Sequence, residues 1–371
     1  MFKNYRVRDY DFKLIFMLVA ITAIGILSVG SARPDLQNRQ LLGFGMGFFI
    51  MVVISFFDYS FFLRFYWIIY VVNVGLLLMV ARFGRVVNNA RRWVEIAGIQ
   101  FQPSELTKIM LVLFYAQFFM KRKEKINSFQ NIVFILTLLV PSVYLIYKQP
   151  DMSTTIVVLV VFCVVWYVGG LSYKLILGTL AIVVPAAIIL FMIVLQPDQT
   201  LINSYQQGRI LAWLHPEQYA QTTAYQQINA MMAIGSGQLW GKGLDNNMIS
   251  SVKNGNFIAE PQTDFIFTII GEEMGFVGGC TVVILLFLIA IECLNVARKA
   301  KDIAGSCIAS GMAALVGFQS FVNIAVATGL FPNTGVPLPF VSYGLTSLVS
   351  LYIGMGFVLN VRLQCVRKYN N

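Results

Sequence analysis

Long apolar runs alternate with short polar segments along almost the whole chain. A helix of about 20 apolar residues crosses the hydrocarbon core of a bilayer. We therefore expect an all-α polytopic membrane protein of about ten transmembrane helices, with residues 1–371 forming a single transmembrane domain. The first run has no cleavage site after it and is read as a retained helix. The ten runs lie near Phe12–Ser31, Leu41–Phe57, Phe61–Ala81, Ser104–Met120, Gln130–Tyr147, Thr154–Gly170, Lys174–Leu195, Asp264–Asn295, Ala304–Leu330 and Val341–Leu363.

One connection, Gln196–Thr263, is too polar to span a membrane and too long to be a simple link. Such a length favours a functional loop, which we place outside the cell. Its Gln- and Tyr-rich part, Tyr205–Tyr225, is expected to form a helix on the membrane surface. The following stretch, AIGSGQLWGKG, is a glycine-rich turn carrying Lys242, and backbone N–H groups of such turns can approach phosphates.

Composition supports the membrane class. The 371 residues are 58% hydrophobic and 12% charged, and the mean hydropathy is +0.73, whereas a soluble domain carries about 25% charged residues. The net charge of +10 fits basic cytoplasmic loops, so no nucleic-acid partner is expected. The five cysteines lie in apolar runs or at their ends and there is one histidine, His215, which makes a disulfide framework or zinc site improbable.

Lys and Arg predict the orientation, because cytoplasmic loops of membrane proteins carry an excess of both. Both termini and the loop after the fourth run are predicted to be cytoplasmic. The supporting residues are Lys3, Arg6, Arg8, Lys13, Lys121, Arg122, Lys123, Lys125, Lys174, Arg298, Lys299, Lys301, Arg362, Arg367 and Lys368.

One predicted outer loop, Arg82–Pro103, contradicts this bias with Arg82, Arg85, Arg91 and Arg92. Either the neighbouring helices fix its orientation, or the guanidinium groups are kept there to bind a phosphate, which they match bidentately. The residues alone leave both interpretations open.

The stretch PQTDFIFTIIGEEMGFVG begins at Pro261 and places Asp264 at the mouth of an apolar helix, with Thr263 as a candidate cap. Water and a polar substrate could reach Asp264, so a functional role is favoured there. Glu272 and Glu273 fall deeper in the run. Intramembrane carboxylates are costly and mark functional sites or ion pairs, and for these two the structural role is favoured.

Three further motifs fall on the predicted outer side. In QPSELTK, Pro103 suits the first helical turn, and Glu105 and Lys108 share one helical face. In KQPDMSTT, Lys148 and Asp151 flank a proline. The irregular GLFPNTGVPLPFVSYG is tolerable at membrane depth only inside protein or along a cavity. Together with Asp264 these motifs predict a cleft open to the outside.

In chain order, NNARRW, QPSELTK, KQPDMSTT, AIGSGQLWGKG, EPQTDFIFTIIGEEMGFVG and GLFPNTGVPLPFVSYG resemble the SEDS family (shape, elongation, division and sporulation) over essentially the whole chain. This family contains RodA, FtsW and SpoVE, and the short N-terminus looks closer to RodA. The resemblance implies a ten-helix peptidoglycan glycosyltransferase of the bacterial plasma membrane that polymerises lipid II, an undecaprenyl-diphosphate-linked disaccharide peptide, at the outer face. It does not distinguish elongation, division and sporulation.

The resemblance also implies roles for individual residues. Asp264 matches the catalytic acid of the family's TDFIF motif. The residues on substrate-binding motif positions are Arg91, Arg92, Glu105, Lys108, Lys148, Asp151 and Lys242. One departure is Gly344-Leu345-Thr346, where the family often has Gly-Gly-Ser.

Joining lipid II units needs a base for the attacking sugar hydroxyl and cations for the leaving diphosphate. Asp264 is the candidate base, and a divalent cation (Mg or Mn) is a further expectation. The family's partner is a class B penicillin-binding protein, a single-pass transpeptidase, and glycines such as Gly279 and Gly311 are candidates for its docking surface. A lipid-linked oligosaccharide transporter and a non-catalytic scaffold remain as alternatives.

Overall fold

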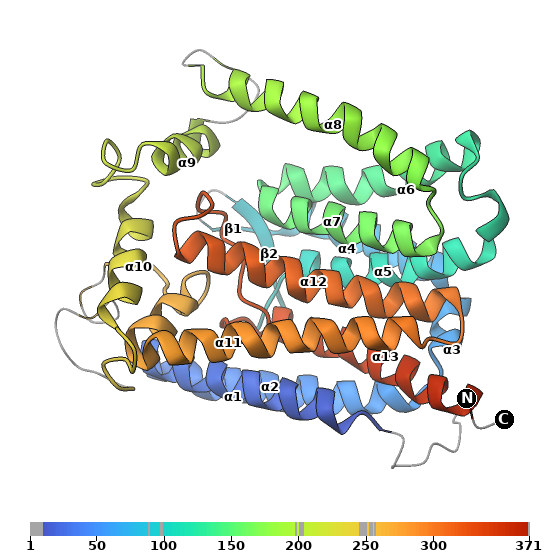
Figure 1. Ribbon diagram of the computed structural model, residues 1–371, viewed down its shortest axis with the longest axis horizontal. Helices are drawn as coiled ribbons and strands as arrows, with labels where there is room; N and C mark the ends of the chain where they lie inside the picture. The colour runs from blue at the N-terminus through green and yellow to red at the C-terminus, as the bar shows by residue number, and fades with distance from the viewer. Residues whose placement is uncertain are drawn as a thin grey trace.

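The computed structural model of the protein describes residues 10–87, 90–96, 99–196, 199, 204–244, 251, 255 and 257–369. Lys3, Arg6 and Arg8 lie outside these residues, as do the side chains of Arg367 and Lys368. Long helices run side by side along the longest axis of the molecule (Figure 1). They are α1 (Phe12–Ala32), α2 (Pro34–Phe56), α4 (Tyr66–Phe83), α5 (Pro103–Lys121), α6 (Phe129–Lys148), α7 (Met152–Gly169), α8 (Tyr173–Val194), α11 (Ile266–Arg298), α12 (Ile303–Ala327) and α13 (Leu345–Tyr369).

The predicted all-α membrane fold is confirmed. Nine helices within the described residues have the length and hydropathy of a membrane span. The remaining long helix, α5, begins at Pro103 as predicted and carries Glu105 and Lys108, which lower its hydropathy. Almost all of its residues up to Phe119 are buried, so α5 is a central helix and its charges lie inside protein.

Several boundaries differ from the prediction. The second helix starts at Pro34 rather than Leu41, because a proline suits the first turn of a helix. The third apolar run is divided into α3 (Tyr59–Arg64) and α4, which Phe65 separates. The five cysteines are free thiols.

The loop predicted over Arg82–Pro103 contains a small antiparallel sheet that the sequence did not indicate. Its strands are β1 (Arg85–Val87), β2 (Ala90–Ile96) and β3 (Ile99–Phe101), in the order β1-β2-β3. The register pairs Val86 with Arg91 and Val94 with Phe101. The sheet gives Arg91 and Arg92 a fixed backbone, so they do not belong to an irregular loop.

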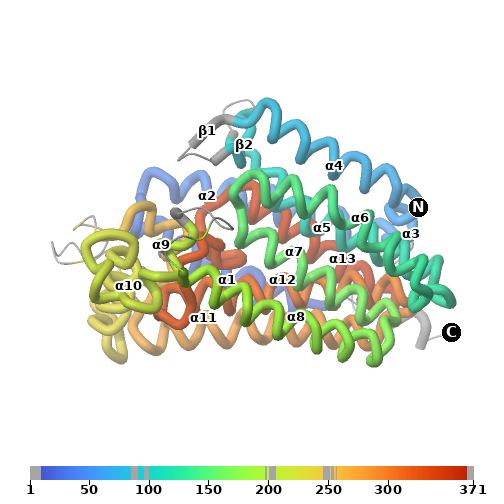
Figure 2. Tube along the Cα trace, turned by 90° about the horizontal axis from the view of Figure 1, so that it is seen from above, coloured from blue at the N-terminus to red at the C-terminus, as the bar shows by residue number. Residues whose placement is uncertain are grey.

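The long connection forms two helices, α9 (Ser204–Leu214) and α10 (Tyr225–Ser236), where one surface helix over Tyr205–Tyr225 was predicted. Helices α9 and α10 and strands β1 and β2 lie at one end of the bundle, and both chain termini lie at the other (Figures 1 and 2). This arrangement gathers the segments predicted to be external at one end.

The prediction of a glycine docking surface is wrong for Gly311. A Cβ atom there would lie 2.8 Å from side-chain atoms of both Val112 and Val165, so Gly311 allows α12 to pack against α5 and α7 inside the bundle. Gly279 is buried as well, and its nearest neighbour is the ring of Phe267.

Candidate active site

Asp264 lies in a turn before α11, which begins at Ile266. The expectation that Thr263 caps this helix is wrong: no side chain caps the helix, and the Thr263 hydroxyl donates to the Glu260 carbonyl at 2.8 Å. The turn leaves Asp264 partly exposed, whereas the next residue, Phe265, is buried. Asp264 is therefore positioned by the irregular segment and not by the helix itself.

Two irregular segments meet at Asp264 and are joined by one amide. Asn323 of α12 donates through Nδ2 to the Asp264 carbonyl at 2.7 Å and to the Val336 carbonyl at 2.6 Å. The Ser342 hydroxyl donates to the Thr263 carbonyl at 2.6 Å. Each carbonyl is satisfied inside the protein, which is the condition for irregular backbone at this depth.

Desolvation and four charged neighbours set the pKa of the Asp264 carboxyl group. Desolvation raises the pKa of Asp264 to about 6, while the positive charges of Arg209 and Arg92 act to lower it and the carboxylates of Asp151 and Glu260 act to raise it. A carboxyl group with a pKa near the working pH has the properties of a general base. Arg209 and Arg92 also supply positive charge for an anionic substrate.

Arg209 of α9 was missed by sequence reasoning. Its guanidinium donates to the Asn333 carbonyl at 3.2 Å, which ties α9 to the segment before α13. One sequence signal could have identified Arg209. It lies in a loop expected to be outside the cell, and such loops are depleted of Arg.

Arg92 and Arg91 are neighbours on β2, so their side chains point to opposite faces of the sheet. Arg92 donates through Nε to the Gln149 carbonyl at 3.2 Å and through a terminal nitrogen to the Pro150 carbonyl. Arg91 is exposed. The structure therefore brings Arg92 to the turn between α6 and α7, within electrostatic reach of Asp264.

Lys148 and Asp151 flank that same turn. Asp151 is buried, and its carboxylate accepts from the Thr154 N–H at 3.2 Å, which makes it the N-cap of α7. Lys148 is exposed at the end of α6, and its ammonium lies 5.8 Å from the centre of the Tyr144 ring. The two predicted residues are thus close in sequence but lie in different surroundings.

The predicted pairing of Glu105 with Lys108 is confirmed. The Lys108 ammonium lies 2.8 Å from Glu105 Oε1, and the two side chains are 3–4% exposed. The Lys108 ammonium also donates to Gln319 Oε1 at 3.0 Å, and the Ser347 hydroxyl donates to Glu105 Oε2 at 2.7 Å. The pair therefore joins α5, α12 and α13.

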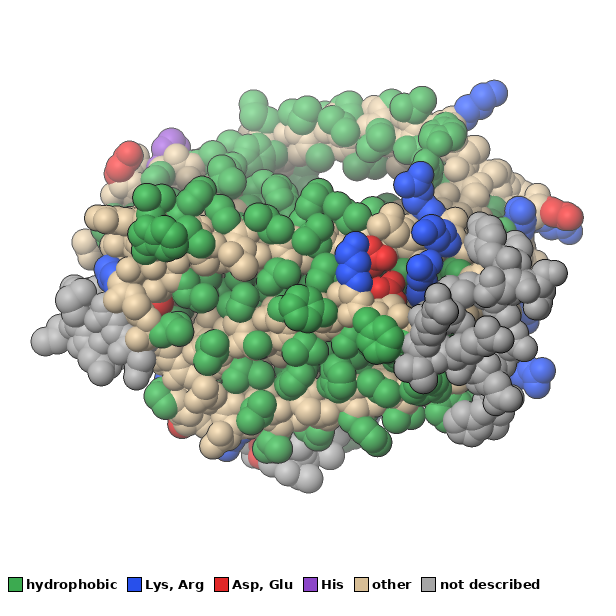
Figure 3. Space-filling view, turned by 60° about the horizontal axis from the view of Figure 1, so that its bottom comes forward, with side chains coloured by type: hydrophobic (Ala, Val, Ile, Leu, Met, Phe, Trp, Pro, Cys, Tyr) green, Lys and Arg blue, Asp and Glu red, His purple; other side chains and the backbone are tan. Residues whose placement is uncertain are grey.

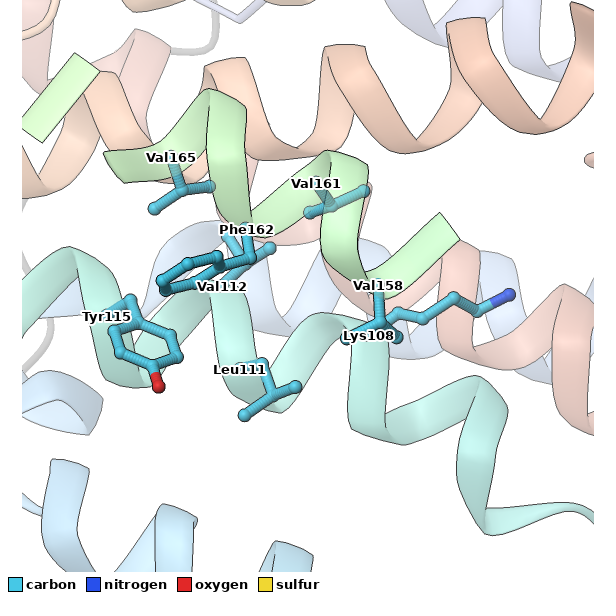
Figure 4. A pocket seen from close by; sticks show the side chains of 8 residues that line it. All are labelled: Lys108, Leu111, Val112, Tyr115, Val158, Val161, Phe162 and Val165. Carbon is cyan, nitrogen blue, oxygen red and sulfur yellow. The ribbon is translucent and has the colours of Figure 1, made fainter. Parts of the chain in front are cut away.

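A cavity of about 10 Å³ lies between α5 and α7 next to this pair, lined by Lys108, Tyr115 and apolar residues (Figure 4). The Lys108 ammonium points away from the other lining side chains (Figure 4). That volume is about the size of one water molecule, so no substrate fits there.

Lys242 is paired with Glu272 of α11 at 2.8 Å. The neighbouring Glu273 accepts from the Ser31 hydroxyl at 2.5 Å. The favoured structural role of the two intramembrane acids therefore has a physical basis, because each contacts a different segment of the chain.

The glycine-rich turn caps a break in α11, at Gly275, where the backbone is non-helical (φ 64°, ψ −162°). The N–H groups of Lys242 and Gly243 donate to the carbonyls of Glu272 and Glu273, both at 3.0 Å. A Cβ atom on Gly241 would lie 2.2 Å from the Glu273 carbonyl oxygen, which explains the glycine. These two N–H groups are used within the fold, so they do not form the phosphate cradle considered from the sequence.

The departure at Gly344-Leu345-Thr346 has a packing role. A Cβ atom on Gly43 of α2 would lie 2.8 Å from the Leu345 side chain, so the two helices meet closely there. The Thr346 hydroxyl donates to the Gln100 carbonyl at 3.0 Å and links α13 to β3.

Within the described part of the chain, no three His, Cys, Asp or Glu side chains come together as a metal site. The carboxylate of Asp151, which acts electrostatically on Asp264, is already a helix cap. A divalent cation held by one carboxylate and substrate phosphates needs no such cluster, so the expectation of one stays a prediction.

The fold and the site define a multi-pass membrane protein with an aspartate in an irregular segment at one end of the bundle and two arginines, on β2 and α9, within electrostatic reach of it. The family model of the FtsW, RodA and SpoVE cell cycle proteins matches residues 10–366. The chain belongs to this family, the SEDS family.

Relatives match over almost their whole length. The chain is 31% identical over 378 residues to the probable peptidoglycan glycosyltransferase FtsW of Trichlorobacter lovleyi, covering 97% of this chain and 94% of that protein. It is 32% identical over 348 residues to the peptidoglycan glycosyltransferase MrdB of Escherichia coli, covering 94% and 91%. These near-equal identities do not assign the chain to one branch of the family.

Solved structures share the fold. The crystal structure of the rod shape determining protein RodA of Thermus thermophilus matches with a TM-score of 0.69 and 29% identity, covering 95% of this chain and 96% of that one. A chain from a peptidoglycan synthase complex that coordinates polymerization and crosslinking matches with a TM-score of 0.77 and 30% identity, covering 96% and 98%.

Proposed function

We propose that this SEDS-family peptidoglycan glycosyltransferase polymerises lipid II, with Asp264 as the general base. The observation that carries the proposal is the Asp264 carboxyl group, whose pKa is raised to about 6 and which lies within electrostatic reach of Arg92 and Arg209. A base and cations for a leaving diphosphate are the two demands of the reaction.

In the proposed reaction a sugar hydroxyl of one lipid II attacks the anomeric carbon of the other. A new C–O bond forms, and the bond from that carbon to the diphosphate oxygen breaks, so the electron pair leaves with undecaprenyl diphosphate. Asp264 accepts the hydroxyl proton. Arg92 and Arg209 stabilise the charge that develops on the diphosphate, because a guanidinium matches phosphate oxygens bidentately.

The other sequence candidates take different proposed roles. Arg91 and Lys148 are exposed at the same end and are placed to attract the anionic substrate. Glu105, Lys108, Asp151, Lys242 and Glu272 act mainly through the fold, since their charged groups pair with one another or cap a helix. Such pairing also accounts for charges at membrane depth without a transport pathway.

Replacing Asp264 by Asn tests the base. Asparagine keeps the size of the side chain but cannot accept the proton, and general-base assistance is worth roughly 10² to 10⁴-fold. We expect Asp264→Asn to abolish polymerisation of purified lipid II while expression and lipid II binding persist. Glu272→Gln is the control and should be milder. Polymerisation by Asp264→Asn at the wild-type rate would show that Asp264 is not the base.

We further propose that both termini are cytoplasmic in the bacterial plasma membrane and that the 196–263 connection is external. The basic residues and the gathering of the termini at one end (Figure 1) support this orientation. A cysteine at Gln207, on a cysteine-free background, should react with an impermeant reagent in intact cells. Reaction only after permeabilisation would reverse the orientation.

The partner proposed is the single membrane helix of a class B penicillin-binding protein. Phe276, Ile284 and Phe287 are 56–66% exposed on α11 and offer an apolar face for it. The same face also suits lipid tails, and copurification distinguishes the two occupants. Alanine at both phenylalanines should reduce copurification with the transpeptidase without lowering folded yield; unchanged copurification would exclude this face.

A further inference from the structure

A groove lies between the end of α7, the last turns of α11 and the start of α12. Its volume is about 480 Å³. It is at the end of the bundle that carries the chain termini, opposite to α9 and α10 (Figure 1). It is therefore remote from Asp264 and has no part in the chemistry proposed above. The lining includes Val168, Ile291, Leu294, Asn295, Arg298 and Ser306.

The lining has an apolar part and a positively charged end. Val168, Ile291 and Leu294 supply hydrocarbon, and Arg298 supplies the charge. The hydroxyl of Ser306 donates to the Ala297 carbonyl at 2.8 Å, so its proton is already used. Arg298 is thus the main donor that the groove offers to an anion.

Arg298 differs from Lys13 and Arg362, two other cations at this end of the bundle. Lys13 pairs with Glu292 at 3.5 Å, and Arg362 pairs with Asp11 at 3.8 Å. Within the described residues, Arg298 makes no ion pair or hydrogen bond, and its side chain is exposed. The Lys13 ammonium compensates the negative charge of Glu292, so the Glu292 carboxylate does not keep an anionic ligand away from Arg298.

The groove is open towards the bilayer. Within α8, Val194 is the only buried residue, so this helix stands away from the bundle along its length. Figure 3 shows an opening between this uppermost helix and the rest of the molecule, with blue cationic side chains beside it. A ligand can therefore enter sideways from the membrane.

We propose that this groove binds one anionic phospholipid of the cytoplasmic leaflet. Its phosphate lies on the Arg298 guanidinium, and an acyl chain lies along Val168, Ile291 and Leu294. Basic pockets between transmembrane helices on the cytoplasmic side bind anionic headgroups in this way. The volume is within the range of ligand pockets, about 300–1,000 Å³.

The test uses the full-length protein in nanodiscs of phosphatidylglycerol and phosphatidylethanolamine, followed by native mass spectrometry of the retained lipid. The wild type should retain phosphatidylglycerol in preference to phosphatidylethanolamine. Arg298→Gln should lower that preference about fivefold, the effect of one basic residue at a membrane surface. Arg298→Lys should keep most of it. Lys123→Gln removes an exposed cation outside the groove and should change nothing.

A second pair of variants tests the apolar part without changing charge. Leu294→Trp fills the groove and should reduce retained phosphatidylglycerol, whereas Leu288→Trp, also on α11 and 39% exposed, should not. Equal retention of the two lipids by the wild type would overturn the proposal, because a neutral lipid or a protein helix would then be the occupant. The proposal is also overturned if Arg298→Gln lowers the lipid preference no more than Lys123→Gln does. It is overturned as well if Leu294→Trp lowers the retained phosphatidylglycerol no more than Leu288→Trp does. Neither readout uses lipid II, so failure here is distinct from failure of the proposed base.

Discussion

Removing one member of the buried Glu105–Lys108 pair should be far more harmful than removing both. The charged atoms are 2.8 Å apart and both side chains are 3–4% exposed, so Lys108→Met leaves the Glu105 carboxylate buried with only the Ser347 hydroxyl beside it. Breaking such a pair costs about 3–5 kcal/mol of unfolding free energy, whereas replacing both partners by apolar residues ranges from neutral to about 1–4 kcal/mol stabilising.

The double variant Glu105→Leu/Lys108→Met also leaves Gln319 and Ser347 each without one partner, at about 1–3 kcal/mol apiece. These costs offset the gain. We therefore expect the unfolding free energy of the double variant to be close to that of the wild type, and that of the single variant to be about 3–5 kcal/mol lower. Equilibrium unfolding in mixed micelles measures both. A single variant that loses under about 1 kcal/mol would refute a buried, coupled pair.

The same variants separate a structural role from substrate binding. If Glu105 and Lys108 act through the fold, a stable double variant should still polymerise lipid II at a substantial rate. If they contact the substrate, the double variant should be folded and inactive. The polymerisation assay on the folded fraction decides between the two roles.

Two other perturbations follow from the site and from the break in α11. Polymerisation should fall as the pH drops below about 6, because protonated Asp264 cannot accept a proton. Arg209→Gln removes a charge that lowers the pKa of Asp264, so the midpoint of the pH–rate profile should move to higher pH. A fixed or lower midpoint would contradict the assignment. Gly241→Ala places a Cβ 2.2 Å from the Glu273 carbonyl oxygen at a φ of +81°. The backbone strain alone should lower the unfolding free energy by roughly 1–3 kcal/mol, as measured by thermal unfolding. The control Gly235→Ala has open space around it and should not lower stability; equal stabilities of the two variants would refute the close packing at the break.

The helices could be predicted from the sequence because each apolar run must satisfy its own backbone in lipid. The short strands of 85–101 could not, since their pairing depends on chain reversal over a few residues and leaves no long periodic pattern. The break at Gly275 was hidden for a similar reason. The N–H groups that cap it come from residues 242 and 243, about 30 positions upstream, and no local pattern reports that contact.

The ion pair of Glu105 and Lys108 was predictable from its i, i+3 spacing, whereas the catalytic role of Asp264 stays a prediction. The sequence could not show that Lys242 is paired with Glu272, or that Asp151 caps α7. Arg209 was missed because its proximity to Asp264 arises only when α9 folds back over the segment that contains Asn333.

Helix α12 connects the buried pair to the segment that contains Asp264. Lys108 donates to Gln319 Oε1, which fixes the direction of that amide, and Gln319 Nε2 then donates to the Pro337 carbonyl at 2.9 Å. One turn further along α12, Asn323 holds the carbonyls of Val336 and Asp264. Two amides on one helical face thus hold the irregular segment in register with Asp264. Through Gln319, Lys108 is therefore linked to the same irregular segment that Asn323 holds against the Asp264 backbone.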